Sequence, residues 1–138
     1  GASSVVDPRV DDVRAVVRDL TRHGVDVVFE TTANDTALIQ GISALRPRGT
    51  LVSVAGWGEL ARFDMGVAMA KEIDVRFTIT YEPAVDYPAT LQMLADGRFD
   101  PTVLISDHIP LARLIDDGLE ELLHHADAHV KILVDPAA

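Results

Sequence analysis

Two glycines, Gly56 and Gly58, directly follow a run of β-type residues and are candidates for binding a phosphate group. A dinucleotide-binding protein usually carries a G-x-G-x-x-G turn between its first strand and the next helix, so that backbone N–H groups approach the pyrophosphate. Here the third position is Ala61, no clear helical pattern follows it, and the turn comes after the second strong strand. Gly56-Trp57-Gly58 is therefore weak evidence for phosphate binding.

Three of the five histidines, His124, His125 and His129, lie close together near the C-terminus. A zinc site needs converging ligands, commonly thiolates with imidazoles, and an H-E-x-x-H helix places two histidines four residues apart. His124 and His129 are five residues apart, and the sequence contains no cysteine. We therefore predict surface histidines at a helix end, where the helix dipole favours a cation, and no metal ligands in this chain.

Residues with the side chains of a catalytic triad, Ser106, Asp107 and His108, are adjacent in the sequence. The members of a triad converge from separate elements, so this arrangement does not predict one. Acid pairs at positions 116–117 and 120–121 alternate with apolar residues on a predicted helix and are expected to face solvent. Residue types and spacing thus predict no catalytic residues in this chain.

Three arginines and three aspartates share one early predicted helix. They are Arg14, Arg18, Arg22, Asp11, Asp12 and Asp19. The four-residue spacing of the arginines places them on one face, which we predict to be an exposed, solvated face. Elsewhere the basic residues are scattered and the net charge is −10, which excludes a surface that neutralises nucleic-acid phosphates.

The composition is that of a soluble globular protein, with 48% hydrophobic and 25% charged residues spread along 138 positions. This length suits one domain. No apolar run approaches the roughly 20 residues that cross a bilayer, and the first residues do not resemble a signal peptide. The absence of cysteine is compatible with a cytoplasmic location, which is the location we predict.

The elements that position these residues alternate between strands and helices. Strands are predicted over residues 4–7, 25–31, 50–55, 74–81 and 129–134. Helices are predicted from a cap at Asp11, from a cap at Asn34 or Asp35, and over residues 86–95 and 111–124; residues 65–71 are predicted to form a short helix or a turn. His108 lies in a predicted loop or short strand. This order predicts an α/β fold with a parallel sheet. The strand from Val25 to Thr31 is so apolar that we expect both of its faces to be covered.

Several segments resemble, in order, the nucleotide-binding domain of medium-chain, zinc-type alcohol dehydrogenases. Residues 24–32 are similar to its fourth strand, residues 46–58 to the next helix exit and fifth strand, and residues 118–122 with 129–134 to its last helix and closing strand. The resemblance is strongest to the butanediol and sorbitol dehydrogenase branch, which Asp86-Tyr87-Pro88 and Gly97-Arg98 also suit. It covers essentially the whole chain.

The resemblance implies a single partial dinucleotide-binding domain, a Rossmann-like doubly wound and mainly parallel sheet that lacks its first two strands. Gly1-Ala2 matches the end of the helix before the family's third strand. The glycine turn, the acidic residue for the ribose and the zinc-bearing catalytic domain would then lie upstream. The implied activity is oxidation of a small alcohol or diol, or reduction of a ketone, with NAD or NADP and an upstream zinc. This chain alone is expected to be inactive.

The resemblance also implies residues that contact the cofactor. These are Thr31 and Thr32 by the ribose, Val54, Ala55 and Gly56 along the nicotinamide, Ile79 and Thr80 with Tyr81 at the carboxamide, and Lys131 near the pyrophosphate. Each also has a purely structural interpretation: Thr31 ends a strand, and Lys131 is an ordinary surface lysine. Residues 78–82 are bulkier than the corresponding family segment.

Two other interpretations stay open. One is a non-catalytic Rossmann-like binding or oligomerisation module, and the other is a zinc-independent quinone reductase of the same superfamily. Removing two strands leaves an edge of the Val25–Thr31 strand unpaired, so we expect Ser4 to Asp7 to fill that place or be displaced, and copies to associate. The family's sixth strand, residues 74–81 here, commonly pairs across a dimer axis, which also implies a homo-oligomer. No nucleic-acid or membrane partner is expected.

Overall fold

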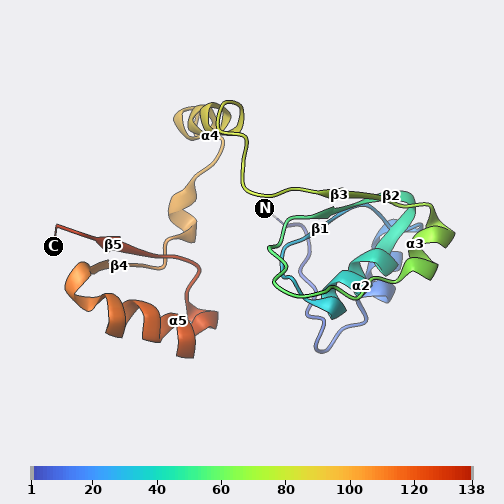
Figure 1. Cartoon of the computed structure of the whole chain (residues 1–138), viewed down its shortest axis with the longest axis horizontal. Coiled ribbons are helices and arrows are strands. Elements are labelled where there is room, and N and C mark those ends of the chain that lie inside the picture. Colours follow the sequence, from blue (N-terminus) through green and yellow to red (C-terminus); the bar gives the residue numbers. More distant parts are fainter. Residues whose placement is uncertain (1, 138) are drawn as a thin grey trace. The chain divides into compact units, whose positions relative to one another are not determined.

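The computed structural model describes residues 2–137, so Gly1 of the Gly1-Ala2 match lies outside the described residues. The chain forms two compact units, Gly1–Tyr81 and Glu82–Ala138. Both contain helices and parallel strands, as Figure 1 shows, which confirms the predicted α/β fold class. None of the helices in residues 2–137 is long and apolar enough to cross a membrane.

The first unit is a three-stranded parallel sheet with its helices in the crossovers. Its elements are α1 (Val13–Thr21), β1 (Val25–Glu30), α2 (Asp35–Ala44), β2 (Leu45–Ser53), α3 (Met65–Lys71) and β3 (Asp74–Phe77). The strands lie in the order β1-β2-β3, with α2 and α3 on the same side of the sheet (Figure 1). The core lies between these two helices and β2, and it consists of Leu38, Ile42, Leu45, Leu51 and Ala68.

Side-chain caps and one glycine set the positions of the helices. Asp12, one residue after the predicted cap, accepts the N–H of Ala15 at 3.1 Å and begins α1. Asn34 caps α2, as predicted. Gly41 lets α2 pack closely on β1, since a Cβ there would lie 2.9 Å from Cγ1 of Val28.

Only one face of β1 is covered, so the prediction that both faces are buried is wrong. Val28 packs against the core, whereas Val27 and Phe29 on the opposite face are 44% and 67% exposed. Because α2 and α3 lie on one side of the sheet, nothing in the first unit packs over the other. The apolar composition of β1 is typical of a strand that is covered on both faces, but the described residues cover only one of them.

Ser4 to Asp7 do not form the predicted strand. The segment leads into a turn in which the carbonyl oxygen of Asp7 accepts the N–H groups of Val10 and Asp11 at 3.1 and 2.9 Å. Of the two alternatives, filling the free edge of β1 or being displaced from it, the described residues show displacement.

The bounds of β2 and β3 differ from the prediction by several residues. β2 begins at Leu45 instead of Thr50 and contains Pro47; the ladder shifts there, since Val25 pairs with Leu45 but Val27 pairs with Thr50. Proline is tolerated in such an irregularity because no ladder bond needs its missing N–H. β3 ends at Phe77 instead of Tyr81.

The second unit pairs two short parallel strands, β4 (Asp107–Pro110) and β5 (Ile132–Asp135). Helix α4 (Asp86–Ala95) has the predicted bounds. The predicted helix over residues 111–124 is divided into a 3-10 turn (Leu111–Arg113), a π-helix (Leu114–Leu119) and α5 (Glu120–His124); further 3-10 turns are Pro101–Leu104 and Ala126–Ala128. Strand β5 starts three residues after the predicted start, because a 3-10 turn precedes it.

Candidate functional site

The carboxyl ends of the three strands of the first unit meet at one edge of the sheet. Glu30, Ser53 and Phe77, the last residues of β1, β2 and β3, are neighbours in register. In parallel α/β sheets the loops at this edge form the ligand site. The loops over residues 31–34, 54–64 and 78–81 carry all but one of the predicted cofactor residues.

Glu30 anchors the first of these loops. Its side chain is 4% exposed, and Oε1 accepts the N–H of Thr32 at 2.6 Å, the hydroxyl of Thr32 at 2.8 Å and the N–H of Ala33 at 2.8 Å. Burial alone would raise the pKa of Glu30, but the hydrogen bonds from Thr32 and Ala33, with the Trp57 side chain, outweigh it and hold the pKa below its ordinary value. The carboxylate therefore stays charged and fixes the Thr31–Ala33 turn.

The backbone of Glu30 also fixes the loop after β2. Its carbonyl oxygen accepts the N–H of Val54 at 2.8 Å and the N–H of Ala55 at 3.2 Å. The sequence analysis did not single out Glu30. Its one sequence signal is an acid that ends an apolar strand, two residues before a hydroxyl side chain that can donate to it.

A cavity of about 520 Å³ opens beside this edge on the side of α2. Three predicted cofactor residues, Ala55, Gly56 and Ile79, line it, and apolar groups including Leu51, Trp57 and Phe77 form its walls. A Cβ added at Gly56 would meet no atom within 4 Å, so the glycine leaves open space above the loop. The cavity is thus an apolar recess of the size that small organic ligands occupy, with backbone exposed at its rim.

The other predicted residues do not line this cavity. Thr31 and Thr32 are exposed at the end of β1, and Val54 is 42% exposed. Thr80 is exposed with φ 55°, just after the shortened β3. Lys131 belongs to the second unit, where it is exposed and its carbonyl oxygen accepts the N–H of Ser106 at 2.8 Å.

The described residues do not fit a zinc ion. Among residues 2–137 there is no group of three or more His, Cys, Asp or Glu side chains that could hold a metal. His124 ends α5 and His125 follows it; both are exposed and contact Glu120 and Glu121, respectively, one turn earlier, at 3.1 and 2.8 Å.

His129 differs from the surface histidine that was predicted. Its side chain is 13% exposed, and Nε2 lies 3.4 Å from a carboxylate oxygen of Glu121. Nδ1 lies 3.7 Å from Asp107, which is within ion-pair distance but too far for a hydrogen bond. The fold of the second unit, which brings the residue before β5 beside the start of β4, accounts for this burial.

Comparison with known proteins places these features in a family. The family model described as zinc-binding dehydrogenase matches residues 1–96. The chain is similar to (R,R)-butanediol dehydrogenase of Neisseria gonorrhoeae, with 35% identity over 98% of this chain and 38% of the relative. Sorbitol dehydrogenase of Bacillus subtilis is 26% identical over 99% of this chain and 38% of that protein.

The similarity extends to a solved structure. The crystal structure of 2R,3R-butanediol dehydrogenase from Bacillus subtilis matches with a TM-score of 0.85 and 35% identity, over 95% of this chain and 37% of that one. The chain therefore spans about 38% of the length of the curated relatives it matches most fully.

Proposed function

Because the chain belongs to the zinc-binding dehydrogenase family, we propose that its two units form part of the cofactor-binding domain of an NAD- or NADP-dependent alcohol or diol dehydrogenase. The observation that carries this proposal is the match to butanediol dehydrogenase in both sequence and structure over nearly the whole chain. The matched length is too short for a whole enzyme of this kind, so we expect the 138 residues alone to be inactive.

The proposed cofactor surface is the carboxyl edge of the first unit's sheet. Ala55, Gly56 and Ile79 would face the nicotinamide, because they line the apolar cavity there. The nicotinamide, when bound, accepts or donates a hydride. Gly56 would allow the ring to approach the backbone.

The remaining predicted residues are proposed for the polar parts of the cofactor. They are Thr31 and Thr32 for the ribose, Val54 beside the nicotinamide, the backbone of Thr80 for the carboxamide, and Lys131 for the pyrophosphate. Glu30 would hold Thr32 in place, since it already accepts the N–H and hydroxyl of that residue. Glu30 would thus contribute to cofactor binding by positioning Thr32, without contacting the cofactor itself.

The similarity to known dehydrogenases also supports proposals for the substrate class and the assembly. The names of the most similar relatives include butanediol and sorbitol, so we propose a small secondary alcohol, diol or polyol and the corresponding ketone. The zinc of the family would be held by residues outside this chain. The exposed apolar face of β1, with Phe29 67% exposed, supports a homo-oligomer or a further part of the same protein packed on the sheet.

Substitution at Gly56 tests the cofactor surface. In the complete enzyme that contains this chain, Gly56→Val should raise the KM for the nicotinamide cofactor by about tenfold or more, because a branched side chain fills the space the ring would occupy. Gly58→Val is the matched control, since a Cβ at either glycine meets no atom within 4 Å. An unchanged KM in Gly56→Val, or an equal change in both variants, would exclude this role for Gly56.

A further inference from the structure

A second cavity lies at the opposite edge of the same sheet. It has a volume of about 310 Å³ and is lined in part by Arg14, Arg18, Gly24, Leu45 and Lys71. Gly24 precedes β1, Leu45 begins β2, and Lys71 ends the helix before β3, so the cavity is at the amino ends of the strands. The proposed cofactor residues of the first unit follow the carboxyl ends, and none of them lines this cavity.

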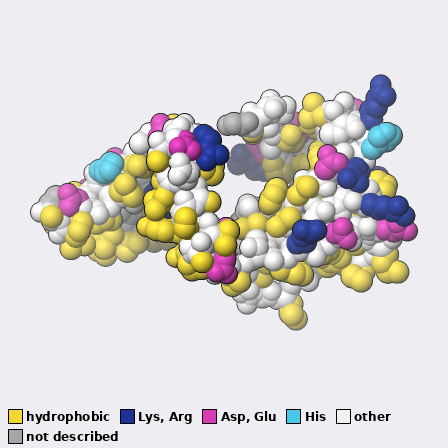
Figure 2. All heavy atoms as spheres, turned by 90° about the horizontal axis from the view of Figure 1, so that it is seen from above, with side chains coloured by type: hydrophobic (Ala, Val, Ile, Leu, Met, Phe, Trp, Pro, Cys, Tyr) yellow, Lys and Arg dark blue, Asp and Glu magenta, His cyan; other side chains and the backbone are white. Residues whose placement is uncertain are grey.

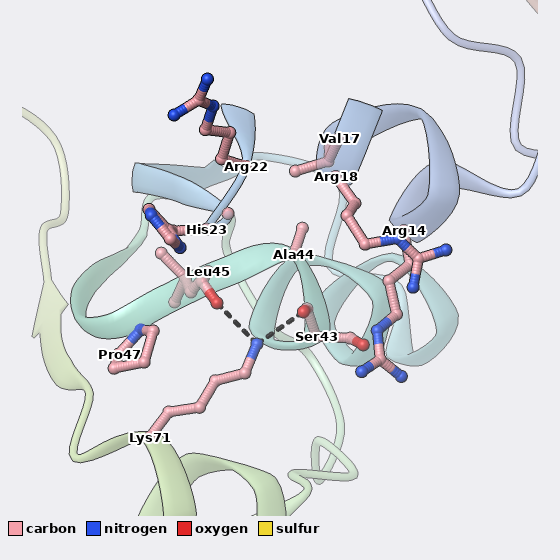
Figure 3. A pocket seen from close by; sticks show the side chains of 11 residues that line it. Arg14, Val17, Arg18, Arg22, His23, Ser43, Ala44, Leu45, Pro47 and Lys71 are labelled. Carbon is pink, nitrogen blue, oxygen red and sulfur yellow. Dashed lines mark hydrogen bonds between the residues drawn. The ribbon is translucent and has the colours of Figure 1, made fainter. Parts of the chain in front are cut away.

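Lys71 is fixed at the floor of this cavity. Its Nζ donates to the carbonyl oxygens of Ile42, Ser43 and Leu45 at 3.2, 2.5 and 2.6 Å, at the carboxyl end of α2 (Figure 3). Burial lowers the pKa of Lys71, and the positive charge of Arg14 lowers it further. The ammonium has no donor left, yet its charge remains close to that of Arg14.

Two arginines of α1, Arg14 and Arg18, add uncompensated charge. Both are exposed, and neither has an ion pair with an acid in the part of the chain that the structure describes. The acids nearest in sequence, Asp11, Asp12 and Asp19, form no ion pair with either arginine among the described residues, and Asp12 accepts the N–H of Ala15 as the cap of α1. Figure 2 shows several dark-blue basic side chains on one part of the surface, with magenta acidic side chains among them.

Figure 3 shows how these charges meet: Arg14 and Arg18 extend from α1 on the same side of the end of α2, and Lys71 reaches that end from α3. The lining also includes Arg22, which follows α1 and points away from Lys71 in Figure 3, so three of its four cationic side chains lie around the end of α2. The partial negative charge at the carboxyl end of α2 offsets only about half an elementary charge, so the space remains strongly positive.

The walls between these charges are apolar and rigid. Val17, Ala44, Leu45 and Pro47 contribute to the lining. Gly24, with φ 101°, allows the backbone to approach closely, since a Cβ there would lie 2.6 Å from the carbonyl oxygen of Ala44. A ligand in this cavity would meet an apolar surface and, at one side, the two arginines of α1.

We propose that this cavity binds a small organic phosphate, with the phosphoryl group held by Arg14 and Arg18 and the apolar part lying on Val17 and Pro47. A dianion suits the site better than a monoanion because three cationic groups surround it. The guanidinium fork matches the oxygen geometry of a phosphate and can hold it with paired hydrogen bonds. The volume is within the range of small-molecule sites. This site is additional to the proposed cofactor surface.

Titration with phenyl phosphate tests the proposal. In the ¹⁵N-labelled 138-residue chain, saturable chemical-shift changes should occur at the amides of residues 14–24 and 43–46. The double variant Arg14→Gln/Arg18→Gln should raise the Kd about tenfold or more, because two charge-assisted contacts are lost. Phenol, which has the ring without the charge, should bind at least about tenfold more weakly than phenyl phosphate, for the same reason.

The control variant is Arg76→Gln, which removes an exposed arginine of β3 and changes the net charge by one. It should leave the Kd within about twofold, since Arg76 does not line the cavity and an exposed charge without direct contact is weakened by salt screening. Three results would overturn the proposal. These are an equal rise in Kd for the double variant and the control, chemical-shift changes scattered over all arginines, and chemical-shift changes confined to residues 31–32 and 54–56. Circular dichroism confirms that each variant is folded.

Discussion

At the scale of single residues, one buried carboxylate organises the candidate site. Glu30 ends β1, receives three hydrogen bonds on one oxygen, and holds the loops after β1 and β2 through its side chain and its backbone. The predicted residues Thr32, Val54 and Ala55 are placed by these bonds. Their position therefore depends on a residue that contacts no ligand in the proposed site.

Glu30 should make stability depend on pH in a defined direction. Its folded pKa lies below the ordinary value of 4.5, so the unfolded chain takes up the proton first as the pH falls. The stability contributed by Glu30 is fully present above pH 4.5 and is lost as the pH falls through the folded pKa. Urea unfolding at a series of acidic pH values should show a shallower decline in the free energy of unfolding for Glu30→Gln than for the unaltered chain.

Other carboxylates with lowered pKa values, such as Asp7 and Asp117, contribute to the acid sensitivity of both proteins. The difference between the two curves of unfolding free energy against pH therefore gives the contribution of Glu30. Parallel curves for Glu30→Gln and the unaltered chain would mean that the hydrogen bonds to Oε1 do not distinguish the charged from the neutral side chain.

At the scale of elements, the junction of β1 and β2 depends on backbone that only glycine allows. Gly24 has φ 101°, and a Cβ there would lie 2.6 Å from both the carbonyl oxygen of Ala44 and the backbone nitrogen of Arg46. The start of β2 must therefore move if residue 24 gains a side chain. The same movement would change the shape of the cavity that Gly24, Leu45 and Lys71 help to line.

Gly24→Ala is expected to lower the free energy of unfolding by more than about 1 kcal/mol, from the strained dihedral angle and the contact with backbone. Gly58→Ala is the matched control, because a Cβ at that position has no neighbour within 4 Å. Thermal and urea unfolding of both variants provide the measurement. A Gly24→Ala protein as stable as the control would show that the β1–β2 junction adapts without cost.

The elements differ in how far the sequence could predict them. Helices α3 and α4 have the predicted bounds, and α2 begins at the predicted cap, because side-chain periodicity and capping are local. The early start of β2 and the short β3 depend on pairing with other strands, which a local pattern does not contain. Coverage of β1 on one face alone depends on the positions of whole helices.

Of the cofactor residues that the family resemblance implies, Ala55, Gly56 and Ile79 line one cavity, although they come from two different loops. Their contact with a cofactor stays a prediction. The sequence did not predict the role of Glu30, because it depends on a turn that folds back onto the carboxylate. Nor did it predict the cavity lined by Arg14, Arg18 and Lys71, because that cavity depends on a lysine of α3 that reaches the end of α2. The arginine spacing on α1 indicated an exposed face but not what lies beside it.

At the scale of the whole molecule, the chain belongs to the zinc-binding dehydrogenase family, and its described residues contain no group of three or more side chains that could hold a metal. It spans about 38% of the length of the curated relatives it matches most fully. The uncovered apolar face of β1 is consistent with a larger assembly, in which a parallel sheet is usually covered on both faces. The proposed activity therefore belongs to the complete protein that contains this chain.

The most direct test of the account is to measure nicotinamide reduction by the product of the complete reading frame that encodes this chain. With zinc-loaded protein and vicinal diols or polyols, NADH or NADPH should form, and the rate should fall on removal of zinc and recover when zinc is restored. Folded, zinc-loaded protein that reduces neither cofactor with any secondary alcohol or diol would contradict the proposal that these residues serve a dehydrogenase.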